Sequence, residues 1–211
     1  MPVPEPLGWA QAGGLPEVFT TAHDALVGQA GLRPGERLLV HGAAGGVGTA
    51  AVQLAARMGA RVTATVRRPE LRDAVADLGA QVVLDPEDFE ASGPYDVVLE
   101  LVGAPNLPGD LRALAIGGRI VVIGVGAGTR AEVDLLALMG KRATVRASTL
   151  RPRPLEEKAA AQRAVERELL PAFAAGLLQV PVAATFGLDE VAAAYDHFAA
   201  GGKLGKVVLE L

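Results

Sequence analysis

The chain has 211 residues, half of them apolar and only 4% aromatic, and its net charge is −4. This composition allows one well-packed domain or two small ones, and the lack of a basic tract argues against nucleic-acid binding. Cysteine is absent, which excludes disulfides and thiolate chemistry. No apolar run reaches the ~18 residues of a membrane span, and the first residues lack a signal-peptide pattern. We therefore expect a soluble, cytoplasmic protein.

Proline dominates the start of the chain. Pro2, Pro4 and Pro6 favour extended backbone, so Met1–Gly14 is predicted to be an extended lead-in. Proline also suits the first position of a helix, and a helix is predicted over Pro16–Ala30.

From Arg37 onward, strand and helix signals alternate. The predicted strands are Arg37–His41, Arg61–Val66, Gln81–Leu84, Tyr95–Glu100, Arg119–Ile123 and Ala143–Ala147. The predicted helices between them are Gly46–Met58, Pro69–Leu78, Leu107–Ala115 and Ala131–Met139. Short apolar strands separated by helices indicate an α/β fold with a doubly wound parallel sheet, because parallel strands need crossover connections. Right-handed crossovers favour the strand order 3-2-1-4-5-6, with a ligand site beside the first strand.

The end of the chain does not continue this alternation. Its predicted elements are a helix over Leu155–Ala175, a strand over Pro181–Phe186, a helix over Leu188–Ala200 and a strand over Lys206–Leu211. Val191, Tyr195 and Phe198 have helical spacing and are predicted to form a packing face. We divide the chain into a lead-in (residues 1–15), a sheet domain (16–150) and a tail of the same domain (151–211).

A glycine-rich turn, residues 42–48 (GAAGGVG), follows the first predicted strand and contains the start of a helix. Gly45 and Gly46 lack a Cβ, so their backbone N–H groups can approach an anion, and the helix N-terminus adds its positive dipole end. Gly48 would let the helix pack closely on the sheet. The turn departs from Gly-x-Gly-x-x-Gly, because Ala43 stands at the first glycine position and one residue is extra. The alternative is a tight loop with no ligand.

Two arginines follow the second predicted strand. A carboxylate at this position would bind the adenosine ribose of NAD, but the chain has Arg67 and Arg68 instead. Guanidinium groups can hold a 2′-phosphate by paired hydrogen bonds, so NADPH is favoured over NADH. Both arginines could also be ordinary surface cations.

The chain resembles the zinc-independent quinone oxidoreductase group of the medium-chain dehydrogenase/reductase superfamily. The segments that carry this resemblance are Leu15–Thr21, His41–Gly48, Gly118–Gly124, Thr149–Arg153 and Gly205–Leu209. The resemblance implies a Rossmann dinucleotide-binding domain. Members of the group begin with a GroES-like barrel, and this chain starts just after the position of that barrel. The C-terminal helix and strand would then dock on the missing barrel domain.

The resemblance also implies a set of cofactor-binding residues. They are Thr21 near the nicotinamide, Ala44, Gly45, Gly46 and Val47 at the pyrophosphate, Arg67 and Arg68 at the 2′-phosphate, Leu101, Val102 and Gly103 at the ribose, and Gly124 and Val125 against the nicotinamide. The last two groups follow carboxyl ends of predicted strands beside the first strand, which is where ligands bind to such sheets.

No residue is assigned as catalytic, and no metal is expected. Glu17 lies where zinc-dependent relatives place a cysteine, but its partner ligands would lie in the missing domain. His41 is predicted to be a structural residue, and His23 and His197 to be surface or packing residues. Lys203 is predicted to be a solvated loop lysine, with approach to the cofactor as the alternative. Hydride transfer to an electron-poor acceptor can proceed by proximity and orientation, with water protonating the product.

We therefore predict an NADPH-dependent oxidoreductase that transfers hydride from nicotinamide to a quinone or a related acceptor such as an enone. The alternatives are an enoyl reductase, for example one excised from a polyketide or fatty-acid synthase, and a non-catalytic NADPH-binding module. The sixth predicted strand, Ala143–Ala147, should be an exposed sheet edge. In the group that the chain resembles, two such edges meet about a two-fold axis, so a homodimer is also predicted.

Overall fold

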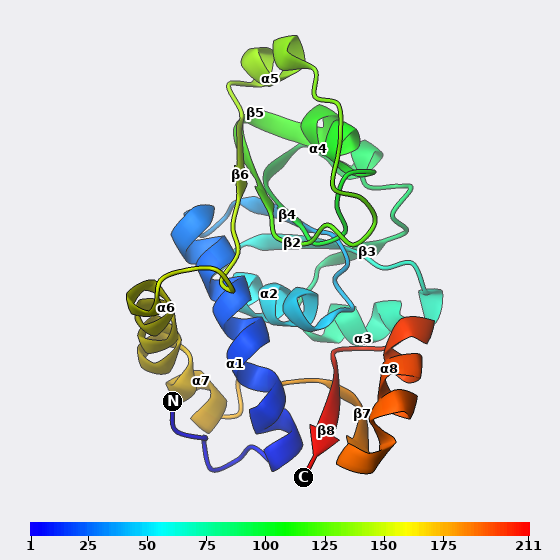
Figure 1. The fold of residues 1–211 in the computed structure, drawn as a ribbon. Helices are drawn as coiled ribbons and strands as arrows, with labels where there is room; N and C mark the ends of the chain where they lie inside the picture. Colours follow the sequence, from blue (N-terminus) through cyan, green and yellow to red (C-terminus); the bar gives the residue numbers. More distant parts are fainter.

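A six-stranded parallel sheet forms the centre of the molecule (Figure 1). The structure is a computed structural model that describes all residues from 1 to 211. The strands are β1 Arg37–Val40, β2 Arg61–Thr65, β3 Val82–Leu84, β4 Tyr95–Glu100, β5 Leu114–Val122 and β6 Thr144–Ala147. Their order is β3-β2-β1-β4-β5-β6, which confirms the predicted doubly wound fold.

Helices cover both faces of this sheet. Figure 1 shows α1, α2 and α3 on one face and α4 on the other. The helices are α1 Trp9–His23, α2 Gly46–Arg57, α3 Arg72–Asp77, α4 Leu107–Ala113, α5 Leu135–Lys141, α6 Leu155–Glu168, α7 Leu170–Ala174 and α8 Val191–Ala200, with a π-helical turn η1 Asp24–Gln29 and 3-10 turns η2 Pro69–Leu71, η3 Glu90–Ser92 and η4 Leu188–Glu190. None of them combines the length and apolar character needed to cross a lipid bilayer.

The core is divided by the sheet into two clusters. Successive side chains of a strand point to opposite faces. Leu38 and Val40 of β1 therefore join a cluster of 33 buried residues beneath α1 and α2. Leu39 points the other way and joins a cluster of seven with Tyr95 and Ile120. Strands buried on both faces explain the continuous apolar runs in the sequence.

The first helix begins earlier than predicted. The lead-in was expected to reach Gly14, but α1 starts at Trp9 and has Pro16 in its interior. A proline inside a helix removes one hydrogen bond to the carbonyl four residues before it. Val18 and Phe19 are 1% exposed, and Phe19 packs edge-on against Phe173 at 4.7 Å between ring centroids. Burial of this apolar face stabilises the helix despite the proline.

Other element boundaries also differ from the predictions. β5 begins at Leu114, five residues before the predicted start at Arg119, because Leu114 pairs with Tyr95 of β4. The helix predicted over Leu155–Ala175 is two helices that meet at Leu169, just before Pro171. The helix predicted from Ala131 begins at Leu135, where Asp134 caps it.

The tail forms a small unit of its own. β7 Val182–Gly187 and β8 Lys206–Glu210 pair in parallel as a separate two-stranded sheet, which α8 contacts. The predicted packing face of α8 is wrong for this chain, since Tyr195 is 70% exposed and Phe198 60% exposed. The helix instead turns Ala194 inward, which is 5% exposed.

Candidate functional site

The glycine turn brings the end of β1 and the start of α2 into direct contact. A Cβ on Gly48 would lie 2.5 Å from the carbonyl oxygen of Gly42 and 2.6 Å from the Cα of Ala43. Both neighbours are backbone atoms that cannot move without displacing the strand. Only glycine therefore fits at position 48, and α2 starts directly against the carboxyl end of β1.

The first amides of α2 are free to bind an anion. Gly45 caps the helix without a side-chain hydrogen bond and is exposed. The N–H of Thr49 donates to the carbonyl of Gly45 at 2.8 Å. The amides of Gly46, Val47 and Gly48 precede this bond, and the first N–H groups of a helix have no partner within it. Together with the helix dipole, they form a site suited to a phosphate.

Two further predicted segments lie beside this turn. Leu101–Gly103 follows β4 and Gly124–Val125 follows β5, so both lie at carboxyl ends of strands. The N–H of Ala127 donates to the carbonyl of Val102 at 2.9 Å, which joins the two loops. A Cβ on Gly42 would lie 3.4 Å from Val102 Cγ2. The three segments thus meet where the strand order reverses, between β1 and β4.

The side chain of Glu100, which the sequence analysis did not single out, organises the loop after β4. Glu100 is 1% exposed. One carboxylate oxygen accepts from the backbone N–H groups of Val102 and Gly103, the latter at 2.7 Å. The other accepts from the Asn106 side-chain amide at 2.9 Å. Burial raises the pKa of Glu100, although the neighbouring His41 acts in the opposite direction.

The backbone of Glu100 extends the same arrangement to the next loop. Its carbonyl accepts from Ile123 N–H at 2.9 Å and Gly124 N–H at 3.1 Å. One residue at the end of β4 therefore fixes the positions of two segments that the sequence analysis assigned to the ribose and the nicotinamide.

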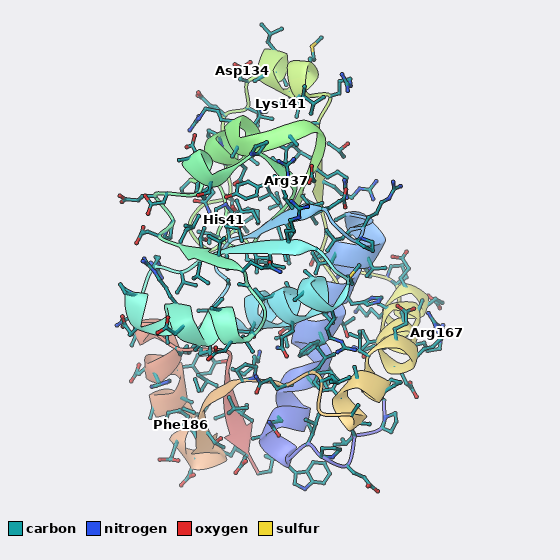
Figure 2. The ribbon with its side chains drawn as sticks, turned by 180° about the vertical axis from the view of Figure 1, so that it is seen from behind. Arg37, His41, Asp134, Lys141, Arg167 and Phe186 are labelled. Carbon is teal, nitrogen blue, oxygen red and sulfur yellow. The ribbon has the colours of Figure 1, made fainter.

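His41 and Asp110 form a buried pair behind the glycine turn. Figure 2 shows His41 inside the molecule, among the strands. Its Nε2 lies 2.8 Å from Asp110 Oδ1 and its Nδ1 lies 3.0 Å from Thr65 Oγ1. The ring satisfies both neighbours as the neutral Nε2–H tautomer or as the imidazolium. His41 therefore has the structural role that was predicted, whereas Asp110, with one oxygen unpartnered, was not foreseen.

His41, Glu100 and Asp110 also form a possible set of metal ligands, because their ligand atoms lie within 4.8 Å of one another. They do not fit a catalytic zinc site. Such a site keeps one coordination position open to water or substrate. These side chains are at most 1% exposed, and they hydrogen-bond to each other, to Thr65, to Asn106 or to backbone amides. Glu17 points elsewhere, and its carboxylate pairs with Lys206 at 3.4 Å.

A cleft of about 800 Å³ lies between α1, the end of β5 and the segment after β6. Thr21 lines it, as does Ile123, which directly precedes the predicted Gly124. The neighbouring Thr20 is 2% exposed, and its hydroxyl has no hydrogen-bond partner. Thr21 thus lies on the same cleft as the carboxyl end of β5, beside which the nicotinamide was predicted to bind.

An ion pair holds one wall of this cleft. Arg153 Nη2 lies 2.6 Å from Asp24 Oδ2, and Ser148 donates to the same oxygen at 3.0 Å. Burial by itself would raise the pKa of Asp24, but the hydrogen bonds from Arg153 and Ser148 outweigh it and lower the pKa. These contacts fix both ends of residues 148–153, of which residues 148–152 line the cleft.

Arg67 and Arg68 are exposed. They follow the carboxyl end of β2, which lies next to the carboxyl end of β1. Arg68 donates to Glu70 at 3.3 Å, and its side chain is 53% exposed. Lys203 does not reach toward them as a free cation. Its ammonium donates to the Phe198 carbonyl at 2.9 Å and lies 4.0 Å from the centre of the Phe198 ring, and burial lowers its pKa.

Comparison with known proteins identifies the family. A model of the zinc-binding dehydrogenase family matches residues 46–166, which is more than half of the chain. The chain belongs to this family. The predicted resemblance to the medium-chain dehydrogenases/reductases is thereby confirmed, and the part of the zinc-binding dehydrogenase fold present here is its nucleotide-binding part.

Oxidoreductases and polyketide synthases are among the proteins to which this chain is similar. A solved quinone oxidoreductase from Thermus thermophilus, also determined in complex with NADPH, is 37% identical with a TM-score of 0.89 and covers 100% of this chain and 69% of that one. The human quinone oxidoreductase is 30% identical over 99% of this chain and 65% of its own length. A spectinabilin polyketide synthase protein of Streptomyces orinoci is 36% identical over 100% of this chain. The chain spans only 10% of that synthase.

We predict that Glu100→Ala lowers the free energy of unfolding by about 1–3 kcal/mol, because buried amide donors lose their acceptor. Glu100→Gln keeps an acceptor oxygen and should lose less. Burial raises the pKa of Glu100 above its ordinary value of 4.5. The contribution of Glu100 to the free energy of unfolding is therefore complete below pH 4.5 and declines as the pH rises through the pKa of the folded state. Denaturant unfolding across pH measures both effects, and a difference between wild type and Glu100→Gln that stays constant with pH would contradict the second.

Proposed function

We propose that this chain binds NADPH and forms the cofactor half of an oxidoreductase that passes hydride from the nicotinamide to a quinone or a related electron-poor acceptor. The observation that supports this proposal most directly is the free helix N-terminus of α2, placed where the loops after β1, β4 and β5 meet. An NADPH complex of a relative that is 37% identical supports the choice of ligand.

Each loop has a distinct task in this proposal. Residues 44–47 hold the pyrophosphate, with the free backbone amides of Gly46 and Val47 as donors. Leu101, Val102 and Gly103 flank the ribose, in positions set by Glu100. Gly124 and Val125 lie against the nicotinamide ring, and Thr21 approaches it from the cleft on the opposite side.

The chemistry of the transfer belongs mainly to the cofactor, since reduced nicotinamide supplies the hydride when it is bound. The protein contributes orientation, and it can contribute a large part of the rate in that way. No side chain is proposed as a general acid. The nearest hydroxyls, on Thr20 and Thr21, can hydrogen-bond to a ligand in the cleft, and water protonates the reduced acceptor.

Arg67 and Arg68 are proposed to hold the 2′-phosphate. Both follow β2, whose carboxyl end lies next to that of β1. The two positions directly after Val66 hold arginines and no acidic residue, and the nearby Glu70 carboxylate is paired with Arg68 at 3.3 Å. Paired hydrogen bonds from guanidinium groups would favour NADPH over NADH.

A homodimer through the β6 edge is proposed as well. All four residues of β6 are exposed, and unpaired strand edges are usually covered. Exposed apolar side chains lie near this edge on α5, namely Leu135, Leu136 and Met139, which are 68–76% exposed. The combination of an open edge and an apolar patch favours association with a second copy.

Replacing both Arg67 and Arg68 by Ala should raise the Kd for NADPH by about 10- to 100-fold, because charged hydrogen bonds to the phosphate are lost. The Kd for NADH should change less than about twofold, since NADH has no 2′-phosphate. Isothermal titration measures both. The matched control is Arg57→Ala with Arg61→Ala, which removes two exposed arginines remote from the site. An equal loss of affinity for NADPH and NADH would refute the assignment of Arg67 and Arg68 to the 2′-phosphate.

The acceptor is tested by comparing a quinone with an enoyl thioester in the longest natural reading frame that contains this chain. Oxidation of NADPH is followed by its absorbance. We expect the higher kcat/KM for the quinone. A higher value for the thioester would favour the enoyl reductase, to which the similarity with polyketide synthases points. Tight NADPH binding without oxidation by either acceptor would favour a non-catalytic module.

Sedimentation equilibrium at micromolar concentration tests the dimer. We expect a mass twice the 21.6 kDa of one chain. Val145→Pro removes an N–H from the β6 edge and should give a monomer. A monomeric wild type at this concentration would contradict the proposal.

A further inference from the structure

The loop before β8 is attached to the glycine turn. Gly205 N–H donates to the carbonyl of Ala44 at 2.8 Å, and Gly205 forms a parallel bridge with Gly45. The side chain of Lys206 covers Gly46, where an added Cβ would lie 2.8 Å from Lys206 Cδ. Residues 201–205, here called the tail loop, and Lys206, the first residue of β8, therefore form one border of the proposed pyrophosphate site. They lie more than 150 positions later in the sequence.

The tail loop also reaches the arginine proposed to bind the 2′-phosphate. A Cβ on Gly202 would lie 2.7 Å from Nη2 of Arg68 and still closer to its Nε and Cζ. The third guanidinium nitrogen, Nη1, donates to Glu70 at 3.3 Å. The guanidinium is thus bounded on one side by the backbone of Gly202 and held on another by Glu70, although the side chain is 53% exposed.

Gly201 provides an internal comparison. Gly201 and Gly202 both have a φ of 68°, which is a value that L-residues rarely adopt, so a substitution at either position strains the backbone. An added Cβ on Gly201 would meet no atom within 4 Å, whereas one on Gly202 would collide with the guanidinium. A side chain at position 202, but not at position 201, would therefore displace the Arg68 guanidinium.

We propose that Gly202 is a specificity-determining residue for the cofactor, because it leaves the space in which the Arg68 guanidinium is seated for the 2′-phosphate. This inference rests on the proposed function of Arg68. A side chain at position 202 would push the guanidinium out of its seat. An exposed arginine that is not held in place loses conformational entropy when it binds, and part of its contribution to affinity is lost. The backbone amides at the pyrophosphate would be unaffected.

The test measures Kd for NADPH and NADH in the 211-residue chain with Gly202→Ala, Gly201→Ala and Arg68→Lys. Gly202→Ala should raise the Kd for NADPH by about tenfold, at the lower limit expected for a charged hydrogen bond. It should leave the Kd for NADH within about twofold. Gly201→Ala has the same φ but no contact, and it should leave the ratio of the two Kd values unchanged.

A double-mutant cycle distinguishes seating of Arg68 from a general loosening of the tail loop. Lysine lacks the planar guanidinium that a Cβ on Gly202 would strike. Adding Gly202→Ala to Arg68→Lys should therefore cause no further loss of affinity for NADPH. Thermal unfolding verifies that each variant folds. If Gly202→Ala does not fold while Gly202→Ala with Arg68→Lys does, the steric conflict with Arg68 is demonstrated directly.

Three results would overturn the inference. They are an unchanged ratio of the Kd values for NADPH and NADH in Gly202→Ala, an equal loss of affinity for both nucleotides, or a further loss of NADPH affinity when Gly202→Ala is added to Arg68→Lys. These results are distinct from failure of the proposed function. That failure would appear as an unchanged ratio in the variant lacking both Arg67 and Arg68.

Discussion

The close approach of α2 to the end of β1 is the constraint on which the site depends. It exists because Gly48 has no Cβ to strike the backbone of Gly42 and Ala43. A larger residue would move the first turn of α2 away from the carboxyl end of β1. The free amides at the start of α2 would then no longer face the point where the strand order reverses. A parallel sheet thus acquires an anion site from one steric condition, without a charged side chain in the turn.

A buried carboxylate provides the second constraint. Placing Glu100 at the end of β4 has a desolvation cost, which hydrogen bonds from two backbone amides and Asn106 offset in part. Those bonds fix the loop after β4, and the carbonyl of the same residue fixes the loop after β5. Rigid loops matter for hydride transfer, since the reaction depends on the distance and angle between donor and acceptor. In the proposed cofactor site, Glu100 therefore acts through backbone geometry.

Much of the fold could be predicted from the sequence because it depends on local patterns. The six strands, their order and the glycine turn follow from short apolar runs, intervening helices and glycines at a strand end. The start of α1 could not be predicted in this way. Pro16 indicates a helix start, but Gly14 and Leu15, which precede it, are buried against the core, and the helix extends back to Trp9. Tertiary packing outweighs local propensity there.

The sequence by itself determined the fold class and the positions of the glycine turn and the paired arginines, since each depends on residues that are neighbours in the chain. Only the tertiary structure decided that Glu100 connects two loops, that Asp110 meets His41, and that Gly202 lies against Arg68. These contacts join residues from different elements, and a lone Glu or Gly has no local signature of its partner. The outward face of α8 was misjudged for the same reason, because helical spacing shows that residues share a face but not what that face meets.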